Sequence, residues 1–470
     1  MGGGGRKFHL FFGRDNAVPR SRAKDRWGNP VTAAGGEAVR HLDDTVTAYL
    51  ALARDTGEHL KATLIADPAM VMAHVLRGYF FLLMGSGPLK ARVLKSLEAA
   101  AAAAEGATPR EQAHVQALRH WLADDAGKAV AAWEAILAES PRDVLALRLA
   151  HHAYFYAGAA GDMRASLDRA AKAWDESVPG YGFVLGMRAF ALEEQGELAA
   201  AEDTGRQAVG INPDDPWAVH AVAHVMETAD RHGEGIAWID DLQPYWSKAN
   251  NFRYHLVWHR ALLQLDRGET HAVLIEYDKS LWDAKSDEYL DLCNDVSLLL
   301  RLEMLGVDVG ARWRPLAEKV AERTDEHILA FIDCHFVAAL AGDGRLKAAR
   351  EMVAGMHAKG GAFEIGAAVG DALLAHREND HRRAAKLLAD ARPDIVRMGG
   401  SHAQRDLFEM MLIDATVKSD DRAGAKALLA ERTAAKPNDP WSWRAYARAL
   451  RELREPAVEA EARADELAGS

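Results

Sequence analysis

The sequence predicts an all-α protein, built as a solenoid of stacked helix pairs. Apolar residues recur with the helical period in segments of roughly 12 to 16 residues, separated by short Gly, Pro or Asp breaks. Strand signals, such as sustained alternation or an Asn-Gly hairpin, are nearly absent. Five prolines at expected helix starts fall 32 to 41 residues apart, namely Pro68, Pro109, Pro141, Pro179 and Pro216. That interval fits two helices with their turns, which bury their apolar faces only by stacking on neighbours.

The helix starts follow one local pattern, an oxygen-bearing cap before a proline. Thr108 precedes Pro109, and Glu111 follows three residues after Thr108, which predicts a capping box. The same pattern predicts helix starts at Ser140–Pro141 (with Asp143 as the acid), Asp67–Pro68, Asp215–Pro216 and Asp439–Pro440.

One unit shows the turns and small residues of a tetratricopeptide repeat. In "GELAAAEDTGRQAVGINPDDPWA" Gly196 makes the tight turn, and Ala200 and Ala208 allow helices to approach closely. Residues 161–174 and 344–356 repeat this spacing. We expect about eleven such pairs between residues 35 and 468, in a right-handed superhelix that is nearly closed. Residues 1–24 are interpreted as a flexible leader and residues 25–470 as one domain.

Composition limits the partners. The net charge of −12 argues against nucleic acid and anionic membranes, and no apolar run reaches the ~18 residues of a membrane span. With only Cys293 and Cys334, neither a disulfide framework nor a cysteine-rich zinc module is available, and both are expected in the core. We expect a cytoplasmic protein.

Longer stretches resemble one family more specifically. They are "DRWGNPVTAAGGEAV", "YGFVLGMRAFALEEQGE", "DPWAVHAVAHVMETADRHGEGIAWI", "NNFRYHLVWHRALLQLDRGE", "DVSLLLRLEMLG" and "MGGSHAQRDLFEMMLIDA". In order, and over roughly residues 23 to 440, they resemble the tetratricopeptide repeat protein 38 family. The resemblance implies a whole-chain α-solenoid and no particular reaction.

Histidines recur at the repeat interval. The first helix of each pair lines the concave face of a tetratricopeptide array, and the expected first helices carry His74, His114, His151, His220, His255, His335 and His402. Their separations correspond to one or two repeats, so a common inner groove is expected rather than a dry core. The predicted groove residues are His151, Glu193, His220, His224, Glu227, His255, His259, His335, His402, Arg405 and Asp406.

Two interpretations fit the densest group. His220 and His224 lie four apart on one helix face with Glu227, and His255 and His259 follow on the next first helix. One interpretation is a divalent metal site with His220, His224 and His255 as ligands. The other is a set of buried His and Glu side chains that bridge adjacent helices by hydrogen bonds.

"GGSHAQRD" also has two interpretations. Gly399 and Gly400 predict a turn, and Ser401 can cap a helix that carries His402 and Arg405. Its amides and Arg405 can hold a carboxylate or phosphate ligand, with His402 as acid or base. Alternatively it is an ordinary helix start, in which Asp406 pairs with Arg405 or a neighbouring helix.

Two functions follow. The first is a repeat protein whose His/Asp/Glu-lined concave face binds a peptide, a protein or a small molecule. The second is an enzyme with a small-molecule active site, with or without a metal ion, in an enclosed central cavity. No phosphate-binding glycine loop, nucleophile elbow or dinucleotide fingerprint occurs in the sequence.

Overall fold

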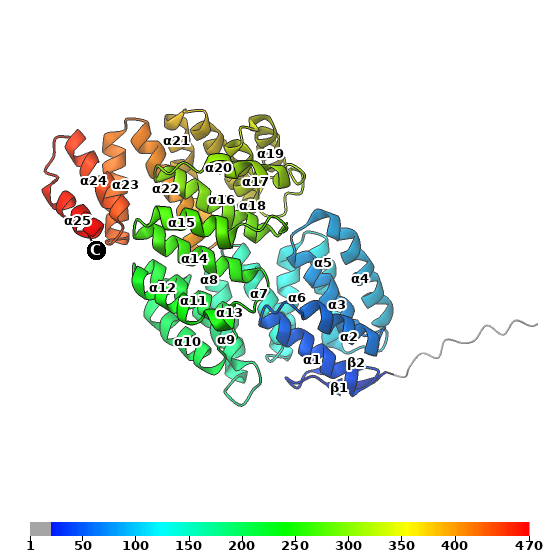
Figure 1. Cartoon of the computed structure of the whole chain (residues 1–470). Coiled ribbons are helices and arrows are strands. Elements are labelled where there is room, and N and C mark those ends of the chain that lie inside the picture. Colours follow the sequence, from blue (N-terminus) through cyan, green and yellow to red (C-terminus); the bar gives the residue numbers. More distant parts are fainter. Residues whose placement is uncertain (1–19, 470) are drawn as a thin grey trace, which may run out of the picture.

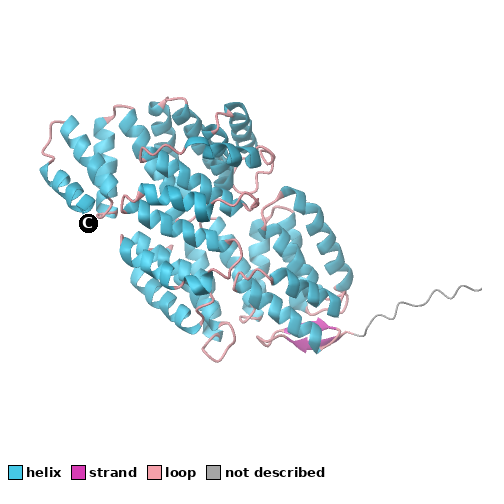
Figure 2. Ribbon diagram, in the orientation of Figure 1, coloured by secondary structure: helices cyan, strands magenta, loops and turns pink. Residues whose placement is uncertain are grey.

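The computed structural model describes residues 20–469 and has the predicted all-α solenoid (Figures 1 and 2). One small antiparallel hairpin, β1 (Ser21–Lys24) with β2 (Pro30–Ala33), precedes the helices. The predicted leader therefore differs from the structure at its end, because Ser21–Lys24 pair with β2. Residues 1–19 of that leader lie outside the described residues.

The described residues form 25 α-helices. The first half comprises α1 Gly36–Leu50, α2 Thr56–Ala66, α3 Val71–Leu83, α4 Lys90–Ala103, α5 Pro109–Leu122, α6 Ala126–Glu139, α7 Val144–Tyr156, α8 Ala160–Ala170, α9 Tyr181–Glu193, α10 Leu198–Ile211, α11 Pro216–Thr228, α12 His232–Asp241 and α13 Gln243–Trp246. The second half comprises α14 Phe252–Asp266, α15 Thr270–Glu276, α16 Tyr289–Met304, α17 Trp313–Val320, α18 Ala330–Gly342, α19 Leu346–Lys359, α20 Ala362–Arg377, α21 His381–Ala391, α22 His402–Lys418, α23 Arg422–Ala435, α24 Pro440–Glu452 and α25 Val458–Gly469. Short 3₁₀ or π segments lie at Gly87–Leu89, Ala171–Ala173, Tyr277–Leu281, Gly310–Arg312 and Arg392–Met398.

Apart from the four-residue α13, these helices form twelve consecutive pairs, from α1 with α2 to α24 with α25. The two helices of a pair differ in burial. On α11 every residue from Pro216 to Glu227 is buried, whereas α10 buries only Ala201, Gly205, Ala208 and Val209. Central first helices such as α11 and α18 are thus covered on almost all sides, whereas α10 lies on the outside.

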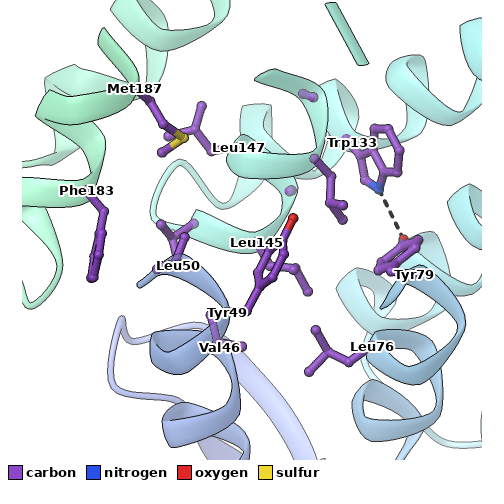
Figure 3. Close-up of a cluster of buried hydrophobic side chains, with 14 of the residues drawn as sticks. Val46, Tyr49, Leu50, Leu76, Tyr79, Trp133, Leu145, Leu147, Phe183 and Met187 are labelled. Carbon is purple, nitrogen blue, oxygen red and sulfur yellow. Dashed lines mark hydrogen bonds between the residues drawn. The ribbon is translucent and has the colours of Figure 1, made fainter. Parts of the chain in front are cut away.

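The N-terminal pairs pack around a continuous apolar core. Figure 3 shows Leu50, Leu76 and Leu145 converging from α1, α3 and α7. The Trp133 indole donates a hydrogen bond of 3.1 Å to the Tyr79 hydroxyl inside this core, so its one polar hydrogen is satisfied. Burial of this kind is what a single helix pair cannot achieve alone.

The array coils tightly enough for distant pairs to touch. Arg54 donates to the Ala249 carbonyl at 2.9 Å, and Arg323 donates to the Gly85 carbonyl at 2.8 Å. In Figure 1 the helices α1–α6 accordingly lie against the remainder of the coil. No helix within residues 20–469 has the length and apolarity needed to cross a membrane.

Of the five starts predicted from a cap before a proline, three are confirmed and two are wrong; Pro179 also lies before its helix, since α9 begins at Tyr181. The capping box at Thr108 is present, and Asp215 and Asp439 cap α11 and α24. At Ser140, however, the preceding helix ends, and Asp143 caps α7 instead. Asp67 likewise ends α2, since α3 begins at Val71. In both cases the proline belongs to the turn between pairs rather than to the first helical turn.

Candidate functional site

The centre of the array holds a cluster of four histidines, His220 and His224 from α11 with His255 and His259 from α14. Their Nε2 atoms converge, at 2.9 Å between His220 and His224, 3.1 Å between His220 and His255, and 3.3 Å between His255 and His259. One ring nitrogen of each lies within 4.8 Å of the other three, and all four side chains are buried. The predicted metal ligands therefore meet, and His259 joins them as a fourth. We call these four residues the histidine cluster.

Local sequence explains this convergence. Asp215 caps α11, accepting from the Trp217 amide at 3.0 Å, and Pro216 occupies the first helical position. The spacing of four places both histidines of each helix on one face. Large aromatic rings fix the imidazoles: Trp258 stacks on His255 with 5.1 Å between ring centroids, and Phe190 stacks on His220 at 5.5 Å.

Outer partners orient three of the rings. His259 Nδ1 lies 3.0 Å from Glu227 Oε2, His255 Nδ1 lies 3.0 Å from Asn294 Oδ1, and His224 Nδ1 lies 3.5 Å from Glu193 Oε2. Carboxylate and amide oxygens accept hydrogen bonds, so Nδ1 of His259 and Nδ1 of His255 carry the hydrogen. The contact between His224 Nδ1 and Glu193 is an ion pair rather than a hydrogen bond. In neutral His255 and His259 the Nε2 atom is then a bare lone pair, and these two lone pairs face each other in a buried space.

Burial sets the charge state of the cluster. It lowers the pKa of His220, His255 and His259 well below the ordinary value, and the neighbouring imidazoles lower it further. Burial also lowers the pKa of His224, but the Glu193 carboxylate outweighs it and the net shift is upward. Three of the rings are therefore neutral at pH 7.

Next to the histidine cluster lies a second polar group, which we call the charge cluster: Asp266, Asp406, Arg432, Lys436 and Asp439. Arg432 Nη1 lies 2.7 Å from Asp406, and Lys436 Nζ lies 3.0 Å from Asp266 on α14. Burial raises the pKa of Asp406, but Arg432 and Lys436 more than offset it and hold that pKa well below its usual range. Every cation here has a carboxylate partner. The charge cluster thus fastens α14 to α22, α23 and α24.

The "GGSHAQRD" segment binds a carboxylate of the chain itself, that of Glu194. Glu194, directly after α9, accepts from the His402 amide at 3.2 Å and lies 3.6 Å from Arg405 Nη2. Ser401 and Gln404 form the capping box of α22. The prediction that these amides and Arg405 hold an external carboxylate or phosphate is wrong, because Glu194 occupies that position. The second interpretation, an ordinary helix start, is confirmed.

Two predicted groove residues lie apart from the histidine cluster. His151 is packed between the Phe190 and Trp217 rings, and neither of its ring nitrogens has a partner among the described residues. His335 donates from Nδ1 to the Phe331 carbonyl at 2.8 Å, and burial lowers its pKa to about 4. Both are core histidines.

The expected open groove is therefore wrong for most of these positions. Of the eleven predicted residues, His402 is exposed, Asp406 is half-buried and the other nine are buried. The tight coil brings α9, α11 and α14 against α22, so the inner faces are filled by protein. What remains on one side of the histidine cluster is a cavity of about 60 Å³, bordered by His220, His255, Trp217, Phe252 and Phe331 among others.

Sequence reasoning missed several participants. Asn294 bonds His255, and the available signal was its position on a first helix, one repeat after 255. Arg432 and Lys436 lie on a second helix or directly after it, where no inner role was expected.

No protein-family model matches the sequence. Among solved structures, the chain is similar to a human IFIT1 dimer with m7Gppp-AAAA, at 14% identity and a TM-score of 0.41, covering 91% of this chain and 96% of that one. It is also similar to the TPR domain of P58(IPK), at 13% identity and a TM-score of 0.22, covering 76% of this chain and 93% of that one. The likeness is one of helical-repeat fold alone, and the exclusion of nucleic acid stays a prediction.

Proposed function

We propose that this protein is a tetratricopeptide-like binding protein that holds one divalent transition-metal ion at His220, His224, His255 and His259. The observation that carries the proposal is the meeting of four Nε2 atoms, where two of the rings are held from behind by hydrogen bonds of Nδ1 to Asn294 and Glu227, and a third lies 3.5 Å from Glu193. Metal-binding histidines usually donate their other N–H to such oxygens.

The nitrogens already lie close to the separation that a bound metal ion requires. A tetrahedral site with Zn–N bonds of about 2.1 Å separates its nitrogens by roughly 3.4 Å. The three closest Nε2 pairs lie at 2.9, 3.1 and 3.3 Å. A proton held by His224 links that ring to His220 alone, whereas one ion accepts all four lone pairs. Imidazole ligands in this geometry favour zinc, with copper and nickel as competitors.

Metal analysis tests the proposal. We expect about one zinc per chain in protein reconstituted with zinc, and less than a tenth of that when His220 and His224 are both changed to Ala. His151→Phe is the matched control, because His151 is equally buried in the adjoining aromatic layer. A folded wild-type protein that takes up neither zinc, cobalt, nickel nor copper would refute the metal site.

A metal-dependent enzyme is the second candidate. The cavity of about 60 Å³ favours it, because His220 and His255 form part of its wall. A zinc ion that expands to five ligands can polarise a bound carbonyl or activate water. Turnover by the zinc form that disappears in His255→Ala, but not in His151→Phe, would support an enzyme.

The burial of the predicted face narrows the partner to a small molecule. Peptides bound by repeat arrays lie on an accessible concave surface, and nine of the eleven predicted residues are covered here. Membership of the tetratricopeptide repeat protein 38 family is part of the proposal, supported by the quoted stretches, two of which carry the histidine cluster. A cytoplasmic location is likewise proposed.

A further inference from the structure

Two cavities lie in line beside the histidine cluster. The smaller, about 60 Å³, borders His220 and His255, and the larger has about 260 Å³. Four residues line both, His152 and Tyr156 on α7, Tyr289 on α16, and Leu329. Because the cavities share these walls, they adjoin one another.

The larger cavity is built for an apolar occupant. Its lining is mainly Leu, Ile, Ala and Trp side chains, for example Leu83 of α3, Trp121 of α5, Leu149 of α7 and Ile332 of α18. None of the residues lining either cavity is Asp, Glu, Lys or Arg. An uncharged ligand can therefore bind without the free-energy cost of removing water from a charged side chain.

Polar groups gather where the two cavities meet. The Tyr156 and Tyr289 hydroxyls share a hydrogen bond of 2.7 Å across the junction. His152 Nδ1 is buried and has no partner among the described residues. Beyond them the smaller cavity is bordered by Ser401, Gln404 and the two cluster histidines. These few polar groups lie at the junction and at the end of the smaller cavity, among side chains that are otherwise mainly apolar.

We propose that the two cavities form one binding site for a small apolar carboxylic acid, with its chain in the larger cavity and its carboxylate directed at the metal held by the histidine cluster. This rests on the metal site proposed above. A divalent ion supplies the positive charge that the walls lack, and a zinc ion with four imidazole ligands accepts a carboxylate oxygen by expanding to five ligands.

The position of the larger cavity adds a consequence. Its walls come from α3, α5, α6 and α7 on one side and from Tyr289 and residues 328–332 on the other. Figure 1 shows that these belong to separate stretches of the array. A bound chain joins them, so binding stabilises the closed coil by mass action.

Cobalt-loaded protein provides the test, because the visible absorption of cobalt reports its coordination number. We expect sodium octanoate to change that spectrum and to bind at least tenfold more tightly than sodium acetate. Acetate has the same carboxylate without the chain. Equal affinity of the two acids would overturn the proposal.

Variants in the larger cavity locate the chain. Ala126→Trp at the exposed rim and Ala153→Phe on the wall should each weaken octanoate at least tenfold and leave acetate unchanged. Ala135→Trp, on the exposed face of the same helix as Ala126, is the matched control and should change neither. Unchanged octanoate affinity in Ala126→Trp and Ala153→Phe contradicts the proposed chain position.

The two proposals fail separately. Cobalt uptake at one ion per chain, measured before any acid is added, reports the metal site alone. Normal uptake with no octanoate response overturns only the carboxylic-acid site. No uptake overturns the metal site, and with it the directed carboxylate.

Discussion

The histidine cluster and the charge cluster lie next to each other inside the coil, and Glu227 contacts both, binding His259 on one side and bordering Asp266 and Lys436 on the other. In the charge cluster the cations and carboxylates neutralise one another, with N–O distances of 2.7 to 3.8 Å. In the histidine cluster three neutral imidazoles and His224 converge on one another instead, with no carboxylate among the four. A buried polar group that is complete by itself holds the fold together, whereas one that lacks its counter-charge is arranged for a ligand.

The largest effect is expected from the charge cluster. Arg432→Met leaves the half-buried Asp406 without its bidentate partner, which should lower the free energy of unfolding by about 3 kcal/mol. Chemical denaturation measures this change, and the metal content of the folded protein should not alter. Arg448→Met, which removes an exposed ion pair, is the control. A loss as small as in that control would remove the structural role given to the charge cluster.

The next effect separates the outer partners from the ligands. Glu227→Gln keeps the shape but removes the carboxylate that orients His259, so zinc affinity should fall about 10- to 100-fold. Competition with a chelator measures the affinity. Glu139→Gln, an exposed change, should leave it as it is. If Glu227→Gln binds zinc as tightly as wild type, the hydrogen bond from His259 to Glu227 does not contribute to zinc affinity.

A third test concerns a histidine outside both clusters. The pKa of His335 is about 4 in the fold, because burial disfavours its charged form, and near 6.5 when unfolded. The unfolded chain therefore binds more protons between these values, and stability falls as the pH drops below 6.5. The contribution between pH 7 and pH 5 is about 2 kcal/mol. His335→Phe should lose that part of the pH dependence, measured by denaturation at both pH values; an unchanged profile would contradict it.

The smallest effect is expected at the surface end of the α9–α22 contact. His402 is exposed; its backbone amide donates to Glu194 Oε1 at 3.2 Å, and its ring Nε2 lies 3.2 Å from the Glu194 carbonyl at the surface. His402→Ala keeps that amide, so the free energy of unfolding should change by no more than about 0.5 kcal/mol. Thermal unfolding and metal content together check this. A large loss in either would return His402 to the functional site.

The fold followed from local signals that act over a few residues. Proline after an oxygen-bearing cap, as at Pro109, Pro216 and Pro440, placed helix starts correctly, and the repeat interval gave the solenoid. The pattern failed at Pro68 and Pro141, because a proline in an inter-pair turn has the same neighbours as one in a first helical turn. The structure has twelve helix pairs, where the sequence predicted about eleven.

Sequence by itself determined which residues share a helix face, since a spacing of four places His220 beside His224 and His255 beside His259 whatever the surroundings. Only the tertiary structure decided that the two pairs meet nitrogen to nitrogen, that Asn294 and Glu193 stand behind them, and that Glu194 satisfies the α22 amides. Those outcomes depend on the small rotation between successive pairs, which accumulates over the array. No short stretch of sequence specifies the accumulated rotation. That rotation decides whether the concave face stays open or is filled by protein.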